Sequence, residues 1–532
     1  MYFLSHLLIF TVIALILFIY YRARKKLNYF KERGVPNSKA IPVFGSIWDN
    51  VIRKKHFFEV FTQLYNDFPD LRFSGFFMFN DPIYLIRDPA LIKQICIKDF
   101  DHFVNHSNNI DIDIDPMLGR SVFFAKDLRW RHTRNILSPL FTGSKMRLMF
   151  SLIAQYCDKI MNTLLTNANG SAKEFEMKDI VTRFGNDIVA SVAFGLEVDS
   201  LKNRDNEFYV NGKKMVKFDG WPGIKLLLAS VCPRLLKLFS KSITDMKTIE
   251  FYVNLVSDTI KYREENENFS RNDMLDLLIK AKTKQSIKSD EDEHQFEESF
   301  AATEHHSLEN TESSIEWTDL DIASQSGTFF FAGFETTANS TCLTIHELAL
   351  NPDIQDRLRG EVDEVLEQLQ GKLLPYEILQ KMKYMDMVVT ETLRKWPPLA
   401  QTDRVCSKQY TITNSDGTEV VLEKNDIIGI PVFAIQRDPK YFPNPEKFDP
   451  ERFSDDNKHE VDPATFLTFG IGPRNCVGSR FALMQMKAII FYILKYSRIE
   501  VSAKTQHPIQ FEKSSFTLNA KNGFWVNFIP RH

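Results

Sequence analysis

The sequence predicts a mainly α-helical protein with small β-sheets, an α+β fold, preceded by one N-terminal transmembrane helix. Three observations lead to this prediction. Residues 2–21 form an apolar run without Asp, Glu, Lys or Arg. Helical periodicity dominates residues 91–280, whereas strand patterns are short, as in residues 71–86. One helical pattern then extends over more than thirty residues from Thr318 and is apolar on nearly every face in its middle, as expected for a helix that crosses a protein core.

The N-terminal run is long enough to cross a bilayer, because twenty residues in a helix span about 30 Å, the thickness of the hydrocarbon core. A basic cluster follows at once, and the positive-inside rule then keeps the rest of the chain in the cytosol. Its members are Arg22, Arg24, Lys25 and Lys26. We expect residues 1–21 to be a signal anchor, residues 22–45 a basic and proline-rich connector, and residues 46–532 the main domain. The alternative, a cleaved signal peptide, would show a basic segment first and a small-x-small cleavage site.

Composition excludes several classes of protein. Apolar residues make up 44% and charged residues 25% of the 532 residues, a globular balance that is not that of a disordered chain. The net charge of −3 offers no basic surface for a phosphate backbone, so no nucleic-acid partner is expected. The six cysteines include no C-x-x-C pair, which argues against zinc clips and iron–sulfur clusters, and disulfides are not expected in a reducing cytosol.

An acidic stretch precedes the long helix. Residues 285–316 are rich in Asp, Glu, Ser and Thr and contain few large apolar side chains, which indicates a solvated, disordered loop. A regulatory or partner-binding role is the alternative. The long helix should then begin at a capping box of Thr318 and Asp321 and end before Pro352.

Shorter elements follow the long helix. A second apolar helical pattern ends at Trp396, before two prolines. Two strand patterns flank Gly417, which can adopt the positive φ of a tight turn, so a hairpin is predicted there. A further hairpin is predicted near the C-terminus, between residues 516–518 and 524–528.

Cys476 stands apart from the other cysteines. It lies in a glycine-containing loop, between Gly472 and Gly478, just before an apolar helical pattern. The N–H groups and dipole of a helix N-terminus favour a thiolate, and so does the nearby Arg474. A lone thiolate without His or Cys companions suits an iron whose equatorial positions are already filled, as they are in haem. Cys476 is therefore a candidate axial ligand of a haem iron.

The spacing F-x-x-G-x-R-x-C-x-G is fulfilled by Phe469, Gly472, Arg474, Cys476 and Gly478. It resembles the haem-thiolate signature of the cytochrome P-450 superfamily. The resemblance implies the P-450 fold, haem b as cofactor, Cys476 as the iron ligand and Phe469 as a haem-binding neighbour. A purely structural cysteine is the alternative, which five fixed positions disfavour. Stretches such as FTGSKM and FGIGPRNCVGSRFAL look most like microsomal insect enzymes of families six and nine, known for metabolising plant toxins and insecticides.

The long helix carries AGFETT between Ala332 and Thr337, which resembles the family's oxygen-activation motif. Gly costs a helix interior about 1 kcal/mol relative to Ala. The small Ala332 and Gly333 would let a porphyrin and bound O₂ approach the helix. Glu335 and Thr336 would relay protons through water to the distal oxygen. The alternative is a glycine that only permits close helix packing, followed by a Thr hydroxyl bonded back to its own helix.

Two charged side chains at i and i+3, Glu391 and Arg394, share one helical face. Most such pairs are weak surface bridges. Here the surrounding sequence resembles the family's E-x-x-R helix, and the segment PERF resembles the part that supplies its third member, Arg452. The resemblance implies a structural role for the three residues in bracing the cysteine loop.

Trp130 and Arg134 stand four residues apart, so both can point the same way from one helix. In the family such a pair meets a haem propionate, and by the same resemblance Arg404 and Arg474 join them. Together they would offer cationic donors to two carboxylates. A stacked surface contact is the common alternative for a Trp and Arg pair.

The resemblance implies a haem-thiolate monooxygenase that inserts one atom of O₂ into an apolar small molecule. Its electrons would come from NADPH through NADPH-cytochrome P-450 reductase, docked near the Cys476 loop, with cytochrome b5 as a second candidate partner. It would lie in the endoplasmic reticulum membrane with a single span, its catalytic domain facing the cytosol. Two alternatives stay open, a reductase-independent haem isomerase or lyase and a haem-binding carrier or sensor.

Overall fold

A computed structural model places most of the chain. It describes residues 2–108, 110–166, 171–216, 223, 225, 228, 236, 242–266, 271, 273–282, 299–303 and 315–531. Most of the acidic stretch predicted to be disordered, residues 285–316, lies outside these ranges.

Helices make up most of the described chain, as predicted. The helices before the central one are α1 (Tyr2–Lys26), α2 (Tyr29–Glu32), α3 (Trp48–Val51), α4 (Phe57–Asn66), α5 (Pro89–Lys93), α6 (Asp127–Leu137), α7 (Gly143–Thr166), α8 (Met177–Phe194), α9 (Glu207–Val216), α12 (Met246–Glu265) and α13 (Met274–Lys282). Those that follow are α14 (Asp319–Leu350), α15 (Pro352–Leu369), α16 (Tyr376–Lys381), α17 (Lys383–Lys395), α18 (Val432–Ile435) and α19 (Ser479–Tyr496).

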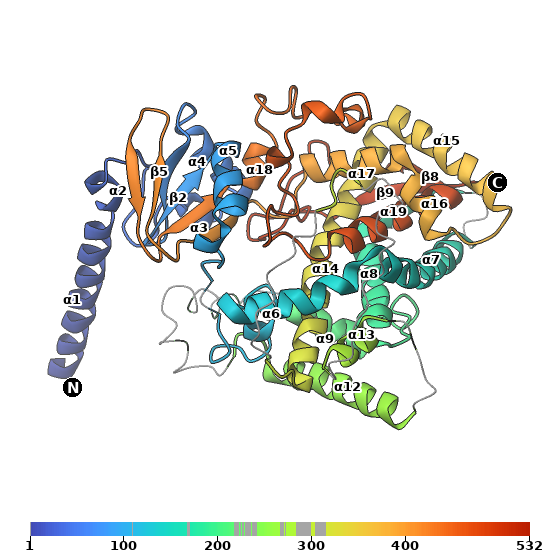
Figure 1. The fold of residues 1–532 in the computed structure, drawn as a ribbon, viewed down its shortest axis with the longest axis horizontal. Coiled ribbons are helices and arrows are strands. Elements are labelled where there is room, and N and C mark those ends of the chain that lie inside the picture. Colours follow the sequence, from blue (N-terminus) through green and yellow to red (C-terminus); the bar gives the residue numbers. More distant parts are fainter. Residues whose placement is uncertain are drawn as a thin grey trace.

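The central helix α14 forms as predicted. The hydroxyl of Thr318 accepts a hydrogen bond from the N–H of Asp321 at 3.3 Å, and the carboxylate of Asp321 accepts one from the N–H of Thr318 at 3.0 Å. Both halves of the capping box are therefore present. The helix ends at Leu350 with Asn351 as its C-cap, and Pro352 begins α15. α14 passes through the helical part of the molecule, beside α8 and α17 (Figure 1).

Three small sheets accompany the helices. Their strands are β1 (Phe73–Met78), β2 (Asp81–Ile86), β3 (Lys173–Glu176), β4 (Thr402–Val405), β5 (Tyr410–Thr413), β6 (Glu419–Leu422), β7 (Ile427–Ile430), β8 (Ser497–Val501) and β9 (Trp525–Pro530). The largest sheet has the order β1-β2-β7-β4, in which only β2 and β7 pair in parallel. This sheet lies on the side of the molecule that faces α1 (Figure 1). Its strand β4 pairs Arg404 with Ile428 and so holds one predicted site residue.

One predicted hairpin is confirmed and the other is wrong. β5 and β6 pair antiparallel around Gly417, whose φ is 83°. Near the C-terminus, β9 pairs instead with β3 and β8, one on each side. Both edges of β9 are therefore occupied, and no edge remains for residues 516–518. Phe516 is accordingly 57% exposed.

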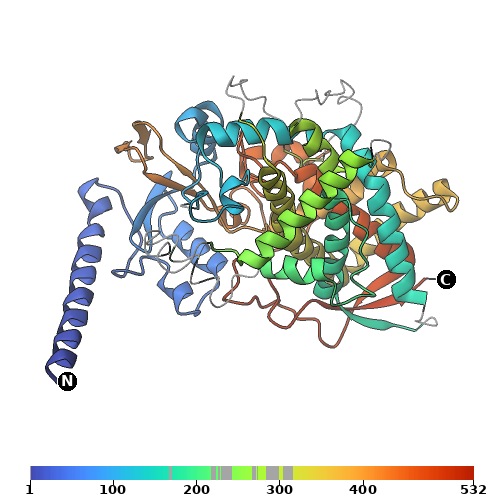
Figure 2. The ribbon, with the colours of Figure 1, turned by 90° about the horizontal axis from the view of Figure 1, so that it is seen from below.

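The N-terminal helix α1 stands apart from the body of the protein in both views (Figures 1 and 2). Its large apolar side chains are exposed, and it belongs to the one helix among the described residues that is long and apolar enough to cross a membrane. The helix runs on past the predicted end of the anchor at residue 21 and includes the basic cluster up to Lys26.

Candidate active site

The loop that carries Cys476 is shaped by its glycines and by one backbone hydrogen bond. The N–H of Cys476 donates to the carbonyl oxygen of Phe469 at 2.7 Å. Gly472 has a φ of 74°, and a Cβ on it would lie 1.9 Å from the carbonyl oxygen of Cys96, so only glycine fits. Gly478 is under no such constraint, because its φ is −97° and a Cβ there would make ordinary contact with Phe141 at 3.6 Å.

Cys476 lies just before the N-terminus of α19, which begins at Ser479. Part of the residue is open to solvent, but the protein around the thiol still removes water from it, and this desolvation raises the pKa of the thiol. A hydrogen bond from the backbone of Gly478 and the charge of Arg134 act in the opposite direction. By itself this thiol therefore stays protonated at neutral pH, and a metal ion that binds it would be needed to hold the thiolate.

The arginine that acts on the sulfur is not the one that we predicted. Arg474 donates to the carbonyl oxygens of Val104 at 2.9 Å, Val122 at 3.1 Å and Ala125 at 2.6 Å. Three of the five N–H groups of its guanidinium thus bind the backbone, which leaves two for a further acceptor. The expectation that Arg474 favours the thiolate is corrected, and Arg134 takes that place.

The structure brings together all four residues that were predicted to meet the haem carboxylates. Arg474 lies over the ring of Trp130 at 4.3 Å, and Arg134 donates to the carbonyl oxygen of Asn475 at 2.7 Å. Burial lowers the pKa of Arg474, and repulsion from Arg404 and Arg134 lowers it further. Burial also lowers the pKa of Arg134 to about 10.

No carboxylate among the described residues forms an ion pair with this arginine cluster, Arg134, Arg404 and Arg474, although the charges of Asp403 and Asp127 raise the pKa of Arg474. The nearest acid in sequence, Asp403, accepts hydrogen bonds from His106 at 2.9 Å and from the N–H of Ser107 at 2.7 Å. The buried Nε of Arg404 has no hydrogen-bond partner among the described residues. Three buried cations with an unsatisfied donor fit a dianionic ligand, as the two propionates of haem are, and the thiol of Cys476 fits its iron.

The middle of α14 is accessible although both of its ends are buried. Residues 321–328 and 337–349 are buried throughout, whereas Ala332 is exposed and Gly333 and Thr336 are partly so. A Cβ on Gly333 would meet nothing within 4 Å, so this glycine does not serve close helix packing. The hydroxyl of Thr336 donates back to the carbonyl oxygen of Ala332 at 2.5 Å, as the alternative foresaw.

Glu335 is held by a lysine from another helix. Nζ of Lys178, on α8, lies 3.0 Å from a carboxylate oxygen of Glu335 and also donates to Asn339. Burial alone would raise the pKa of Glu335. The charge and hydrogen bond of Lys178, together with hydrogen bonds from Asn519 and Asn339, outweigh burial, and the pKa is lowered. The carboxylate is therefore ionised at neutral pH. Its role as a proton relay stays a prediction.

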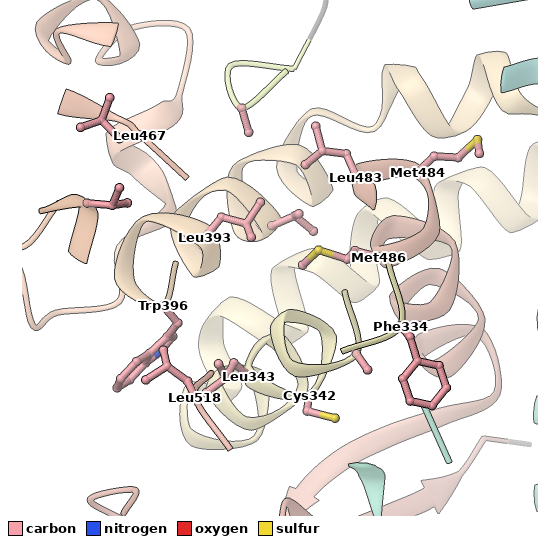
Figure 3. Close-up of a cluster of buried hydrophobic side chains, with 14 of the residues drawn as sticks. Phe334, Cys342, Leu343, Leu393, Trp396, Leu467, Leu483, Met484, Met486 and Leu518 are labelled. Carbon is pink, nitrogen blue, oxygen red and sulfur yellow. The ribbon is translucent and has the colours of Figure 1, made fainter. Parts of the chain in front are cut away.

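The Cys476 loop and the accessible part of α14 are linked through Phe141. Its ring lies against Gly478, and its centroid is 5.5 Å from that of Phe329 on α14. Beside them, α14, α17 and α19 share a buried apolar cluster that includes Phe334, Leu393 and Met486 (Figure 3). The two predicted halves of the site are thus parts of one packed core.

The predicted brace, Glu391, Arg394 and Arg452, also comes together. Glu391 and Arg394 are fully buried and make two hydrogen bonds, at 2.7 and 2.8 Å. Nε of Arg452 lies 3.6 Å from the carboxylate of Glu391. Arg394 also donates to the carbonyl oxygens of Gln436 at 3.0 Å and Pro445 at 2.8 Å.

Gln436, which no sequence motif indicated, connects this brace to the cysteine loop. The residue is fully buried. Its Nε2 donates to the carbonyl oxygens of Leu393 at 3.0 Å and Arg394 at 2.9 Å. Its Oε1 accepts from the N–H of Leu467 at 2.6 Å and from the hydroxyl of Thr468 at 3.1 Å. The only local feature that could have drawn attention to Gln436 is that this polar residue precedes the charged pair Arg437 and Asp438.

A thiol before a helix, an arginine cluster beside it and an accessible stretch of a buried helix define a haem-thiolate class of protein. A family model described as Cytochrome P450 matches residues 35–526. The chain belongs to the cytochrome P450 family, and it is therefore a haem-dependent monooxygenase of the oxidoreductase class.

Insect relatives match almost the whole chain. Probable cytochrome P450 9f2 of Drosophila melanogaster is 42% identical over 98% of this chain and 99% of its own length. Cytochrome P450 9e2 of Blattella germanica is 38% identical over 95% of this chain and 94% of its own. Cytochrome P450 6B1 of Papilio polyxenes is 33% identical over 98% of each chain. The predicted likeness to insect families six and nine is confirmed.

Replacing Gln436 with leucine should disturb the cysteine loop beyond a general loss of stability. Each buried group left without a partner costs about 1–3 kcal/mol. Gln355 is a matched control, because it is also buried and both ends of its amide are bonded. Its Nε2 donates to the carbonyl oxygens of Leu348 and Ile499, and its Oε1 accepts from the N–H of Ile499. We expect Gln436→Leu and Gln355→Leu to lower the free energy of unfolding alike, but only the first to weaken the thiolate band of the reduced carbon-monoxide complex. Equal bands in the two variants would contradict this role.

Proposed function

We propose that this protein is a membrane-anchored monooxygenase that inserts one atom of O₂ into apolar small molecules, with plant toxins and insecticides as the expected class. Electrons would come from NADPH through a separate flavoprotein reductase, with cytochrome b5 as a second candidate donor. The observation that carries the proposal is the arrangement of Cys476, the arginine cluster and the accessible middle of α14. The relatives in families six and nine support the substrate class.

The residues present would hold haem b from two sides. Cys476 would bind its iron, while Arg134, Arg404 and Arg474 would bind its propionates, with Trp130 packed under Arg474. Bound haem would supply the activation and cleavage of O₂. Ala332 and Gly333 would leave space for it, because neither presents a large side chain at the accessible part of α14.

Glu335 and Thr336 would deliver protons at the accessible middle of α14. The hydroxyl of Thr336 bonds to the carbonyl oxygen of Ala332, so it can accept a second hydrogen bond from water. Glu335 would exchange protons between bulk water and that hydroxyl, with Lys178 setting its ionisation.

The membrane location rests on α1. We propose that it anchors the protein in the endoplasmic reticulum membrane as a single span, because the basic cluster directly follows the apolar run. The catalytic domain would then face the cytosol, where NADPH is available.

The function is tested with purified full-length protein, reductase and NADPH, by product mass over a panel of apolar compounds. A product one oxygen atom heavier, formed only with both NADPH and reductase, is expected. Turnover supported by peroxide and unaffected by removing NADPH and reductase would favour an isomerase or lyase. An intact haem spectrum without any product would favour a carrier or sensor.

Replacing Lys178 with methionine should move the pH dependence of coupling. The variant keeps the burial that raises the pKa of Glu335 but loses the charge that lowers it, so the carboxyl stays protonated to higher pH. The measured quantity is the product formed per NADPH, plotted against pH. The part of this curve that follows the ionisation of Glu335 should shift to higher pH. Lys178→Arg keeps the charge and is the control. A profile unchanged in Lys178→Met would show that Glu335 is not in the relay.

A further inference from the structure

A short piece of the acidic stretch lies on the cysteine loop. Residues 299–303, with the sequence Ser-Phe-Ala-Ala-Thr, belong to the long connection between α13 and α14. The ring of Phe300 packs on Phe453 and Phe466, with centroid distances of 5.1 and 5.6 Å. Ala301 is only 2% exposed. We call residues 299–303 the strap.

Thr303 bonds the strap directly to the residue that carries the thiol. Its hydroxyl donates to the carbonyl oxygen of Cys476 at 3.2 Å and lies 2.9 Å from the hydroxyl of Ser479. The N–H of Thr303 donates to the same Ser479 hydroxyl at 3.4 Å. Because Ser479 is the first residue of α19, the strap contacts both the loop and the start of the helix that follows it.

The strap belongs to a stretch of unusual charge. Residues 289–316 contain ten Asp or Glu and no Lys or Arg. Five residues of this stretch are nonetheless in place on the protein surface at the loop, by an aromatic contact and by hydrogen bonds. The connection from α13 to α14 is thus attached to the Cys476 loop. Its acidic composition by itself gives no reason to expect such an attachment.

We propose that the strap is an intramolecular cover of the electron-entry face, and that it competes with the electron-donating protein for this surface. This inference rests on the proposed function, in which a separate reductase docks near the Cys476 loop. A partner that reaches the carbonyl oxygen of Cys476 or the Phe453 and Phe466 rings must displace the strap or bind over it. The apparent dissociation constant of the partner then rises as the fraction of molecules with a free face falls.

The test removes both attachments of the strap in the full-length protein. The double variant Phe300→Ala/Thr303→Val loses the ring and the hydroxyl. We expect its Kd for the reductase to fall several-fold, and its haem to be reduced faster at low reductase concentration under anaerobic conditions. Reduction by dithionite, which needs no protein docking, and the carbon-monoxide band should stay unchanged. Phe251→Ala, which removes another half-buried ring, on α12, should leave the Kd unchanged.

Other results would overturn the inference in distinguishable ways. An unchanged or higher Kd in the double variant, with its band intact, contradicts the competition. If the double variant loses its carbon-monoxide band, the single variant Thr303→Val tests the competition instead, because it keeps the Phe300 packing and removes one hydroxyl. An unchanged Kd for the reductase in Thr303→Val would also contradict the competition. A different result would contradict the proposed function on which the inference rests. In that case dithionite reduces the haem of the unmodified protein but the reductase does not.

Discussion

Replacing Cys476 with serine is expected to abolish monooxygenase activity and the optical band of the thiolate-ligated, reduced carbon-monoxide complex. The serine hydroxyl keeps the size of the side chain but is not ionised near neutral pH, so it cannot donate the electron density that a thiolate gives to iron. Product formation with NADPH and reductase, together with the spectrum, measures both effects.

Cys157→Ser is the control for this experiment. Cys157 is a buried cysteine on α7, so its replacement tests what a hydroxyl in the core costs by itself. We expect Cys157→Ser to be less stable than the unmodified protein and to keep the thiolate band. A Cys476→Ser protein with band and turnover intact would remove the basis for the haem site.

Replacing Glu391 with glutamine should have the second largest effect, on folding. The change leaves Arg394, which is fully buried, and Arg452 without their carboxylate. Breaking one side of a buried ion pair costs about 3–5 kcal/mol, which is a large part of the roughly 5–15 kcal/mol that stabilises a typical protein. We expect little folded, haem-containing protein, measured by haem content and by chemical denaturation.

The matched control for this prediction is an exposed carboxylate. Glu446 pairs with Arg437 at 2.9 Å, but its side chain is 71% exposed, and such pairs contribute about 0–1 kcal/mol. Glu446→Gln should therefore fold and bind haem as the unmodified protein does. Similar losses in the two variants would show that burial of the Glu391 pair is not what makes it important.

Local patterns were sufficient for most of the elements, and the family resemblance added most of the predicted site residues. Residue spacing along the chain predicted the capping box at Thr318, the hairpin around Gly417 and the positions of Cys476 and Glu391. These are features of neighbouring residues, and their physical causes act over a few positions of the chain. The C-terminal hairpin failed because a strand pattern does not say which partner a strand will have, and β9 pairs with β3 and β8.

By itself, the sequence determined that one thiol stands before a helix, that an apolar run opens the chain and that Gly333 lies in the middle of the longest helix. The tertiary structure alone decided which arginine acts on that thiol and that Lys178 holds Glu335. It also decided that Gln436 joins the brace to the cysteine loop and that the strap contacts this loop. Lys178 and Glu335 are separated by 157 residues in the sequence. The separation is 173 residues for Thr303 and Cys476, and 341 residues for Arg134 and Asn475. No periodicity spans such separations, because contacts between distant residues are set by how the whole core packs.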